Sequence, residues 1–411
     1  MKNKGSIIIL AVIFILIVII KSFAFDAIKI IIKEYIEVQN SNKDFNTPIH
    51  LRRDSISYED SLILSKIFPK SKYKGKIYYM VYGKKVLDDE KSIDLSDVKI
   101  DGSLKEKLKL LTNVIEVDLH NQDLSYEEQL ELVETFKDIT FKWKVDIAGE
   151  QVEYDVDELD LSRKRVSNID DFKKALKLLK NLKKLDMSYT NLSNYQLGML
   201  REEFPDIRID WVVHLGKWSV KTDAIAFSVL IYKYDYKRMT SADIQVLKYC
   251  TELQALDLGH QSITDISVIG DYLPNLRILI LADNNIRDIS PISKLKHLHY
   301  LELFMNNITD SSPLKECKEL VDLNISFNHS FSDISGILDL PLLERLWLIS
   351  DNISNASYMK IRATYPKVKL ITTGSGSTES GWRTHPRYYA MISMFKDRYF
   401  MSEEFSKYDG E

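Results

Sequence analysis

The side chains that could carry out chemistry are few and scattered. The chain has two cysteines, Cys250 and Cys317, and among its eight histidines His297 and His299 alternate around one leucine and could share a face. A zinc site needs further ligands at characteristic Cys/His spacings, which the sequence does not provide. The sequence also contains no Gly-x-Ser-x-Gly elbow, no phosphate-binding loop and no dinucleotide-binding fingerprint. We therefore predict no catalytic residue, no metal site and no cofactor.

The composition argues against a nucleic-acid-binding protein. The chain has 411 residues and a formal net charge of -4, with Lys and Arg mixed among Asp and Glu throughout. It has no basic stripe of the kind that binds phosphates, so we predict no nucleic-acid partner. Its apolar content is that of a folded protein, and its length is too great for one ordinary globular core. Such a chain either divides into domains or grows by repetition.

Five segments in the second half share the spacing Leu-x-x-Leu-x-Leu, with isoleucine in the last place of one copy. Leu-x-Leu alternation predicts a short strand with one face directed inward. A polar residue stands at the same distance after each start, where its side chain can bond to backbone groups of the following turn. The repeats start at Leu253, Leu276, Leu298, Leu320 and Leu343, and the polar residues are Gln261, Asn284, Asn306, Asn328 and Asp351.

This pattern resembles the leucine-rich-repeat family, specifically the short repeats of bacterial surface internalins. The resemblance implies an α/β solenoid, with parallel strands on its concave face and helices and 3-10 turns on its convex face. Each repeat leaves apolar surface that only a neighbouring repeat can cover, so the units must stack. The resemblance also implies adhesion or host contact, but no particular ligand, because members of the family share the repeat and not the partner.

A longer repeat recurs in the first half. Residues 141–155 alternate in polarity and turn at Ala148-Gly149, which predicts a β-hairpin. Residues 171–179 carry apolar side chains at helical spacing and would cover the convex side. We therefore interpret each long unit as two leucine-rich repeats, with strands at Leu159 and Leu185, plus an inserted hairpin. The matched positions are Phe136, Ile139 and Trp143 in one copy and Phe204, Ile207 and Trp211 in the next.

The N-terminus has the composition of an export signal. A basic start precedes the unbroken apolar run Ile7–Ile20, and Lys21 follows. Two alternatives remain open: cleavage after Ala24, or an uncleaved helix extended to Phe25 that would cross a bilayer of about 30 Å. We favour the N-terminal transmembrane helix slightly. Either alternative predicts an extracellular protein, anchored to the membrane at its N-terminus or secreted.

The residues that alternate with the inward leucines should face the concave surface. Several of them are aromatic or aliphatic, and such a patch on one sheet is typical of a site for a protein partner. The alternative is that a hairpin or the tail of the same chain covers this patch. The candidate partner-binding residues are Ile278, Ile280, Tyr300, Glu302, Phe304, Arg345, Trp347 and Ile349.

Two further functions are compatible with the same residues. Tyr300, Trp347 and Trp382 could stack on sugar rings, so carbohydrate or cell-wall binding is an alternative to a protein ligand. A structural envelope scaffold that uses its repeats for self-association is another.

The C-terminal part begins with a Gly- and Ser-rich loop, residues 374–381. Beyond it, Tyr388, Ile392, Phe395 and Tyr399 form one apolar stripe at helical spacing. The favoured interpretation is a helix that seals the open end of the solenoid, as such folds require. The alternative is a tail that contacts a ligand, with Trp382 and Arg383 as anchors.

Each cysteine stands three residues before a repeat start, where other repeats carry leucine. Cys250 and Cys317 are three coils apart, about 14 Å at the usual strand spacing. A disulfide needs α-carbons within about 7 Å. We therefore predict two buried free thiols with no catalytic role. The predicted segments are an export or anchor segment (1–25), a linker (26–54), long repeats with hairpins (55–235), short repeats (236–372) and the C-terminal loop with its capping helix (373–411).

Overall fold

The computed structural model of the chain describes residue 33 and residues 55–67, 75–229 and 237–397. The predicted export or anchor segment, residues 1–25, lies outside the described residues. Within the described ranges, no helix combines the length and the apolar character needed to cross a bilayer. The chain divides into two compact units, one formed by residues up to Val156 together with Asn168–Asn181, the other by Asp157–Ser167 together with residues from Leu182 onward.

The first unit consists of short parallel strands, helices and antiparallel hairpins. Its elements are β1 (Ser55–Ser57), α3 (Tyr58–Ile67), β2 (Lys76–Val81), β3 (Lys84–Leu87), β4 (Ser92–Asp94), α4 (Leu104–Lys109), β5 (Glu116–Asp118), α5 (Tyr126–Thr135), β6 (Thr140–Lys142), β7 (Lys144–Ile147), β8 (Glu150–Glu153) and α6 (Ile169–Leu178). Strands β4, β5 and β6 are parallel, with Ile93, Val117 and Phe141 in register. These three side chains are buried, because alternate residues of a strand point to the same face.

The hairpin predicted between residues 141 and 155 is confirmed. Strands β7 and β8 pair antiparallel, with Val145 opposite Val152. The turn residues Ala148 and Gly149 have φ angles of 54° and 80°. A two-residue type I′ turn requires positive φ at both of these positions, which glycine adopts without a Cβ penalty. The local sequence therefore determines where the chain reverses.

Helices of the long repeats begin at side chains that cap their free N–H groups. Ser125 accepts a hydrogen bond from the backbone of Glu128, and the Glu128 carboxylate accepts one in return from the backbone of Ser125. Ser193 and Gln196 form the same reciprocal pair at the start of α7 (Asn194–Glu203). Such caps satisfy N–H groups that have no partner inside the helix. The helix predicted over residues 171–179 forms as α6, which lies beside α5 in the first unit.

The second unit opens with a three-stranded parallel sheet. Its first elements are β9 (Glu158–Asp160), β10 (Lys184–Asp186), α7, β11 (Arg208–Asp210) and the hairpin strands β12 (Val212–Leu215) and β13 (Trp218–Lys221). Leu159, Leu185 and Ile209 stack in register across β9, β10 and β11. The sequence interpretation of two repeat strands per long unit was therefore wrong, because β11 is a third. Its single inward isoleucine lies between Arg208 and Asp210 and lacks the leucine signature.

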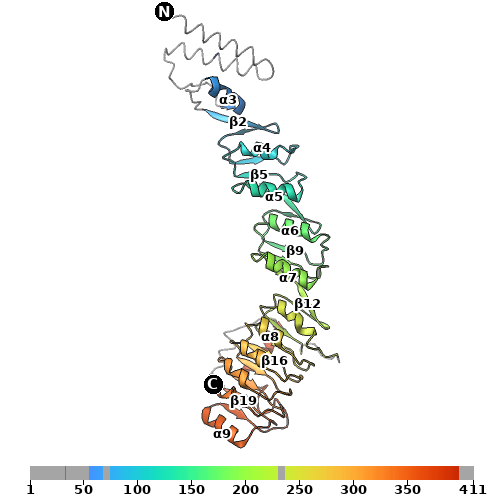
Figure 1. Ribbon diagram of the computed structural model, residues 1–411, viewed down its shortest axis with the longest axis vertical. Helices are drawn as coiled ribbons and strands as arrows, with labels where there is room; N and C mark the ends of the chain where they lie inside the picture. The colour runs from blue at the N-terminus through green and yellow to red at the C-terminus, as the bar shows by residue number, and fades with distance from the viewer. Residues whose placement is uncertain (1–32, 34–54, 68–74, 230–236, 398–411) are drawn as a thin grey trace, which may run out of the picture. The chain divides into compact units, whose positions relative to one another are not determined.

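The short repeats build one seven-stranded parallel sheet (Figure 1). Its strands are β14 (Ala226–Ser228), β15 (Ala255–Asp257), β16 (Ile278–Ile280), β17 (Tyr300–Glu302), β18 (Asp322–Asn324), β19 (Arg345–Trp347) and β20 (Lys369–Ile371). The helices between them are η1 (Asp243–Tyr249), α8 (Ser267–Tyr272), η2 (Ser290–Lys294), η3 (Ser312–Glu316), η4 (Ile337–Asp339) and α9 (Asn355–Thr364). Leu256, Leu279, Leu301, Leu323 and Leu346 lie in register on successive strands and are fully buried. The leucine-rich-repeat architecture predicted from the spacing is confirmed.

The polar residue after each strand forms a ladder through the turns. The Asn306 side-chain amide donates to the carbonyls of Leu281 (2.9 Å) and Leu303 (3.1 Å), and its oxygen accepts from the backbone N–H of Ile286 (3.0 Å). Asn284 and Asn328 make the equivalent bonds one coil before and after. The ladder satisfies buried backbone groups that the short strands leave without partners.

The ladder ends at Asp351, a carboxyl where the preceding coils have an amide. Its Oδ1 accepts from the backbone N–H of Asn328 at 2.8 Å, while Oδ2 is buried with no hydrogen-bond partner among the described residues. Burial raises the pKa of Asp351 to about 8. The side chain is therefore mostly protonated at neutral pH.

Close stacking of the convex turns leaves no room for a side chain at Gly336. A Cβ at this position would lie 1.7 Å from the carbonyl oxygen of Ser311 in the coil before. We expect Gly336→Ala to lower the free energy of unfolding by about 1–3 kcal/mol, since backbone must move to admit the methyl group. Gly102→Ala is the matched control, because nothing lies within 4 Å of its Cβ position. Urea denaturation of both variants checks this, and equal midpoints would contradict the stacking geometry.

Candidate functional site

The sheet brings the predicted site residues together on one face. Strands β16, β17 and β19 carry six of them, and Phe304 and Ile349 follow two residues after β17 and β19. The registers give two rows across the sheet, because side chains on parallel strands align when the strands pair in register. One row is Ile278, Tyr300, Asp322, Arg345 and Lys369, and the other is Ile280, Glu302, Asn324, Trp347 and Ile371.

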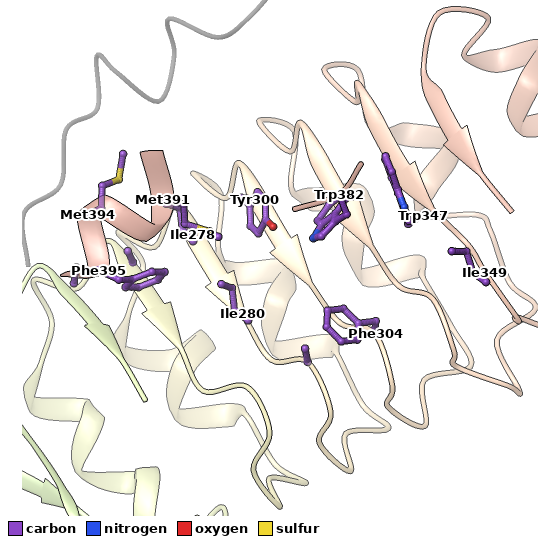
Figure 2. Close-up of a cluster of buried hydrophobic side chains, with 13 residues drawn as sticks. Ile278, Ile280, Tyr300, Phe304, Trp347, Ile349, Trp382, Met391, Met394 and Phe395 are labelled. Atoms are coloured by element: carbon purple, nitrogen blue, oxygen red, sulfur yellow. The ribbon is translucent and has the colours of Figure 1, made fainter. Parts of the chain in front are cut away.

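The expectation that this patch is exposed was wrong. All eight predicted residues have exposed fractions between 0% and 4%. Residues 374–397, called here the C-terminal segment, supply the cover, and their side chains join the same buried cluster (Figure 2). The apolar alternation in the strands indicated that something must cover the sheet, and in this structure the cover belongs to the chain itself.

Trp382 is the central anchor of the C-terminal segment. Figure 2 shows its indole between Tyr300 and Trp347, and the ring centroids lie 5.3 Å and 5.0 Å away. Its Nε1–H donates to the Glu302 carboxylate at 2.7 Å, and the Arg345 guanidinium lies over its ring at 4.7 Å. Trp382 is completely buried. The two rows of side chains on the concave face, together with Phe304 and Ile349, are called here the groove. Both the apolar faces and the polar edge of the indole are therefore satisfied by groups of the groove.

The remainder of the C-terminal segment returns along the sheet toward its first strand. Helix α10 (Pro386–Asp397) contributes Met391, Met394 and Phe395 to the buried cluster and contacts β14. Figure 2 shows these side chains beside Ile278, several strands away from Trp347. The sequence interpretation placed this helix as a seal on the open end of the solenoid. The structure differs, because α10 packs against the strand at the opposite edge of the sheet.

A buried ion cluster fixes the middle of the C-terminal segment. The Asp322 carboxylate, fully buried, accepts from Arg387 at 3.0 Å and 2.9 Å and from Nε of Arg345 at 2.8 Å. Arg387 also reaches the Glu344 carboxylate at 2.6 Å. Burial alone would lower the pKa of Arg387, but the Asp322 carboxylate outweighs it and the pKa is raised. The guanidinium therefore stays charged and binds both carboxylate oxygens of Asp322.

Glu302 is the second buried carboxyl of the groove. It accepts hydrogen bonds from the Tyr300 hydroxyl and from Trp382 Nε1. Burial raises the pKa of Glu302, and these two donors oppose that effect. The pair of acidic groups, Glu302 on β17 and Asp322 on β18, gives the groove two deep acceptors on adjacent strands.

Side chains of the groove also hold the backbone of the C-terminal segment. Trp347 Nε1–H donates to the carbonyl of Glu379 at 2.9 Å, and the Asn324 amide donates to the carbonyl of Ser377 at 2.8 Å. These bonds do not depend on the identity of the side chain at either acceptor. The groove therefore recognises a peptide backbone as well as particular side chains.

Sequence reasoning placed Asp322 and Asn324 on the concave face without naming them as partner-binding residues, and it missed Arg387. The signal for the first two was available, since an acid and an amide occupy concave positions between apolar neighbours. No local signal marks Arg387, because its partner Asp322 is 65 positions away in the sequence.

The two cysteines and the pair His297 and His299 are the other side chains that the sequence offered for chemistry. Cys250 and Cys317 are free and buried, as predicted, and burial raises the pKa of each thiol to about 12. Both therefore remain protonated and unreactive. His297 and His299 both lie near the Glu319 carboxylate. Across the described ranges, no three His, Cys, Asp or Glu side chains gather in a way that could hold a metal ion.

The comparisons with known proteins identify the repeats. Residues 274–316 match the family model described as leucine-rich repeats in two copies. No curated protein sequence matches the chain. Among similar solved structures, internalin C2 of Listeria monocytogenes has a TM-score of 0.31 and 23% identity over 53% of this chain and 81% of its own.

Two further solved structures share this likeness. The internalin InlF of Listeria monocytogenes has a TM-score of 0.34 and 20% identity over 71% of this chain and 86% of its own. A leucine-rich-repeat protein of Leptospira interrogans has a TM-score of 0.32 and 18% identity over 64% of this chain and 74% of its own. The family-model match over residues 274–316 confirms the resemblance of these repeats to leucine-rich repeats.

Proposed function

We propose that this leucine-rich-repeat chain binds a protein partner non-covalently, through the concave face of the sheet β14–β20. The observation that carries the proposal is that the groove holds a peptide segment of the chain, with Trp382 between Tyr300 and Trp347. Six of the eight predicted residues, all but Glu302 and Arg345, belong to the buried cluster that lines that groove. The apolar run Ile7–Ile20 supports an extracellular location, with the chain anchored or secreted.

The groove has the features of a recognition site. Aromatic and Arg side chains at its centre are the residue types that dominate binding energies at protein interfaces. They stand on strands that neighbouring coils hold in place, so a partner would meet a preformed surface with little ordering cost. The buried carboxyls Glu302 and Asp322 add selectivity, because a ligand that leaves either without a partner is penalised. These properties favour binding over catalysis.

Selection from a random peptide library tests the proposal. The full chain in mild detergent is compared with its Trp382→Ala variant, in which the central pocket is emptied. We expect Trp382→Ala to enrich peptide clones that wild type does not, and we expect added Tyr300→Ala and Trp347→Ala substitutions to abolish their binding. Tyr195→Ala is the control, because this side chain is 69% exposed on α7. Clones that bind all groove variants equally would rule out the concave site.

A further inference from the structure

We infer that the C-terminal segment is an intramolecular ligand that keeps the groove closed, and that the partner displacing it is a peptide bearing an indole and a guanidinium spaced as in Trp382 and Arg387. The inference rests on the proposed function and names the partner class for the same site. On this inference the C-terminal segment competes with the partner for the groove.

The C-terminal segment is attached to the solenoid in a way that allows it to leave. Strands β14 to β20 bond their backbones to one another in sequence order. In the described part of the chain, the backbone N–H groups of Glu379 and Tyr388 bond to carbonyls inside the segment, and the groove reaches the segment through side chains. Departure of the segment would therefore break side-chain contacts and leave the strand ladder intact.

The first part of the C-terminal segment, which follows β20, is suited to act as a tether. Residues 374–381 read Gly-Ser-Gly-Ser-Thr-Glu-Ser-Gly, a composition that behaves as a flexible linker when it is not held. Gly381 has a φ of 96°, which a residue with a side chain rarely adopts. A short flexible tether gives the peptide attached to it an effective concentration on the order of 1 mM at the groove. A free ligand must outcompete that local concentration.

The margins of the covered groove are open to solvent. A cleft of about 490 Å³ lies where Phe395 and Lys396 meet β13 and β14. Another of about 600 Å³ lies where His385 and Arg387 meet residues 343–345 and 364–369. An incoming chain could therefore contact the groove at either margin before the C-terminal segment has left.

The chemistry of the displacing ligand follows from what the segment satisfies. Asp322 is paired by two N–H groups of Arg387, a geometry that the planar guanidinium provides and a lysine ammonium does not. Glu302 takes the indole N–H of Trp382, whose ring fills the aromatic pocket. A ligand without the guanidinium would leave Asp322 paired with Arg345 alone and without the two bonds that Arg387 donates, and one without the indole would leave an empty pocket. The groove therefore selects peptides that carry both groups.

A labelled synthetic peptide of residues 374–397 tests this inference directly. Its binding to the full chain is measured by fluorescence anisotropy, with wild type compared to Arg387→Glu, which weakens the attached segment. We expect at least tenfold tighter apparent binding to Arg387→Glu, because the tethered competitor is lost. Unlabelled peptides carrying Trp382→Ala or Arg387→Glu should compete at least tenfold less well than the native peptide. These peptide controls do not depend on the folding of any protein variant.

A second design avoids destabilising substitutions. A protease site is inserted between Gly376 and Ser377 of the full chain, and the tether is cut after folding. We expect the cut segment to exchange with excess labelled peptide under native conditions. A cut segment that stays bound until the chain unfolds, together with no peptide binding to Arg387→Glu, would overturn the inference in favour of a purely structural strap. Library clones that bind the groove while this peptide does not would sink the inference and leave the proposed function standing.

Discussion

Replacing Asp322 with alanine is expected to lower the free energy of unfolding by about 3–5 kcal/mol, the usual result of removing one partner from a buried ion pair. The Asp322 side chain is fully buried between the guanidinium groups of Arg345 and Arg387, which are themselves almost inaccessible. Alanine leaves Arg345 without its carboxylate and Arg387 with the half-exposed Glu344 alone. Two positive charges would then face each other in a region from which water is largely excluded.

Chemical denaturation followed by circular dichroism measures this loss. Glu319→Ala is the matched control, since that carboxylate is 41% exposed and should contribute less than about 1 kcal/mol. A double variant, Asp322→Ala with Arg387→Met, separates charge from shape. We expect it to be more stable than Asp322→Ala alone, because one uncompensated charge is gone. A double variant less stable than the single one would show that the electrostatic explanation is wrong.

The leucine spacing predicted the architecture because its cause is local. Each coil contains inward leucines at alternate positions and a polar residue at a fixed distance after them. The residues that determine the fold of a coil therefore lie within that coil. Leu301 and Asn306 could be assigned because the same spacing returns in five successive repeats. The third strand of the long units, β11, escaped prediction because Trp211 follows Ile209 at the position where β9 and β10 are followed by Leu161 and Met187. Its position is determined by pairing with β10, which is tertiary information.

The cover of the groove could not be predicted from the same pattern. Apolar residues such as Tyr300 and Trp347 on the concave face require burial, but the requirement is equal for a partner and for a tail of the same chain. The choice depends on contacts between residues far apart in the sequence, above all Arg387 with Asp322 and Trp382 with Glu302. The spacing of the repeats contains no information about such long-range pairs. The sequence showed the apolar stripe of helix α10, but it did not indicate that this helix packs against β14.

Asp351→Asn is expected to stabilise the protein, by an amount that grows with pH. The folded chain holds this carboxyl at a pKa of about 8, against 3.8 for an unperturbed aspartate. Between these two values the folded state keeps a proton that the unfolded state releases, so wild-type stability falls as pH rises. The slope is at most about 1.4 kcal/mol per pH unit for one proton. Asparagine carries no proton to lose, and its amide can donate as Asn328 does to the carbonyl of Ile325.

This prediction is checked by measuring the free energy of unfolding of wild type and of Asp351→Asn at intervals from pH 4 to pH 9. The difference between the two should be small near pH 4, widen up to about pH 8 and then level off, since both states are ionised above that value. Asp257, whose buried carboxyl has a pKa raised to about 6, titrates in both proteins and cancels in the difference. A difference that is constant across this range would mean that the carboxyl of Asp351 is already ionised in the folded chain. The asparagine ladder would then end with a charged group that water or a shifted neighbour satisfies.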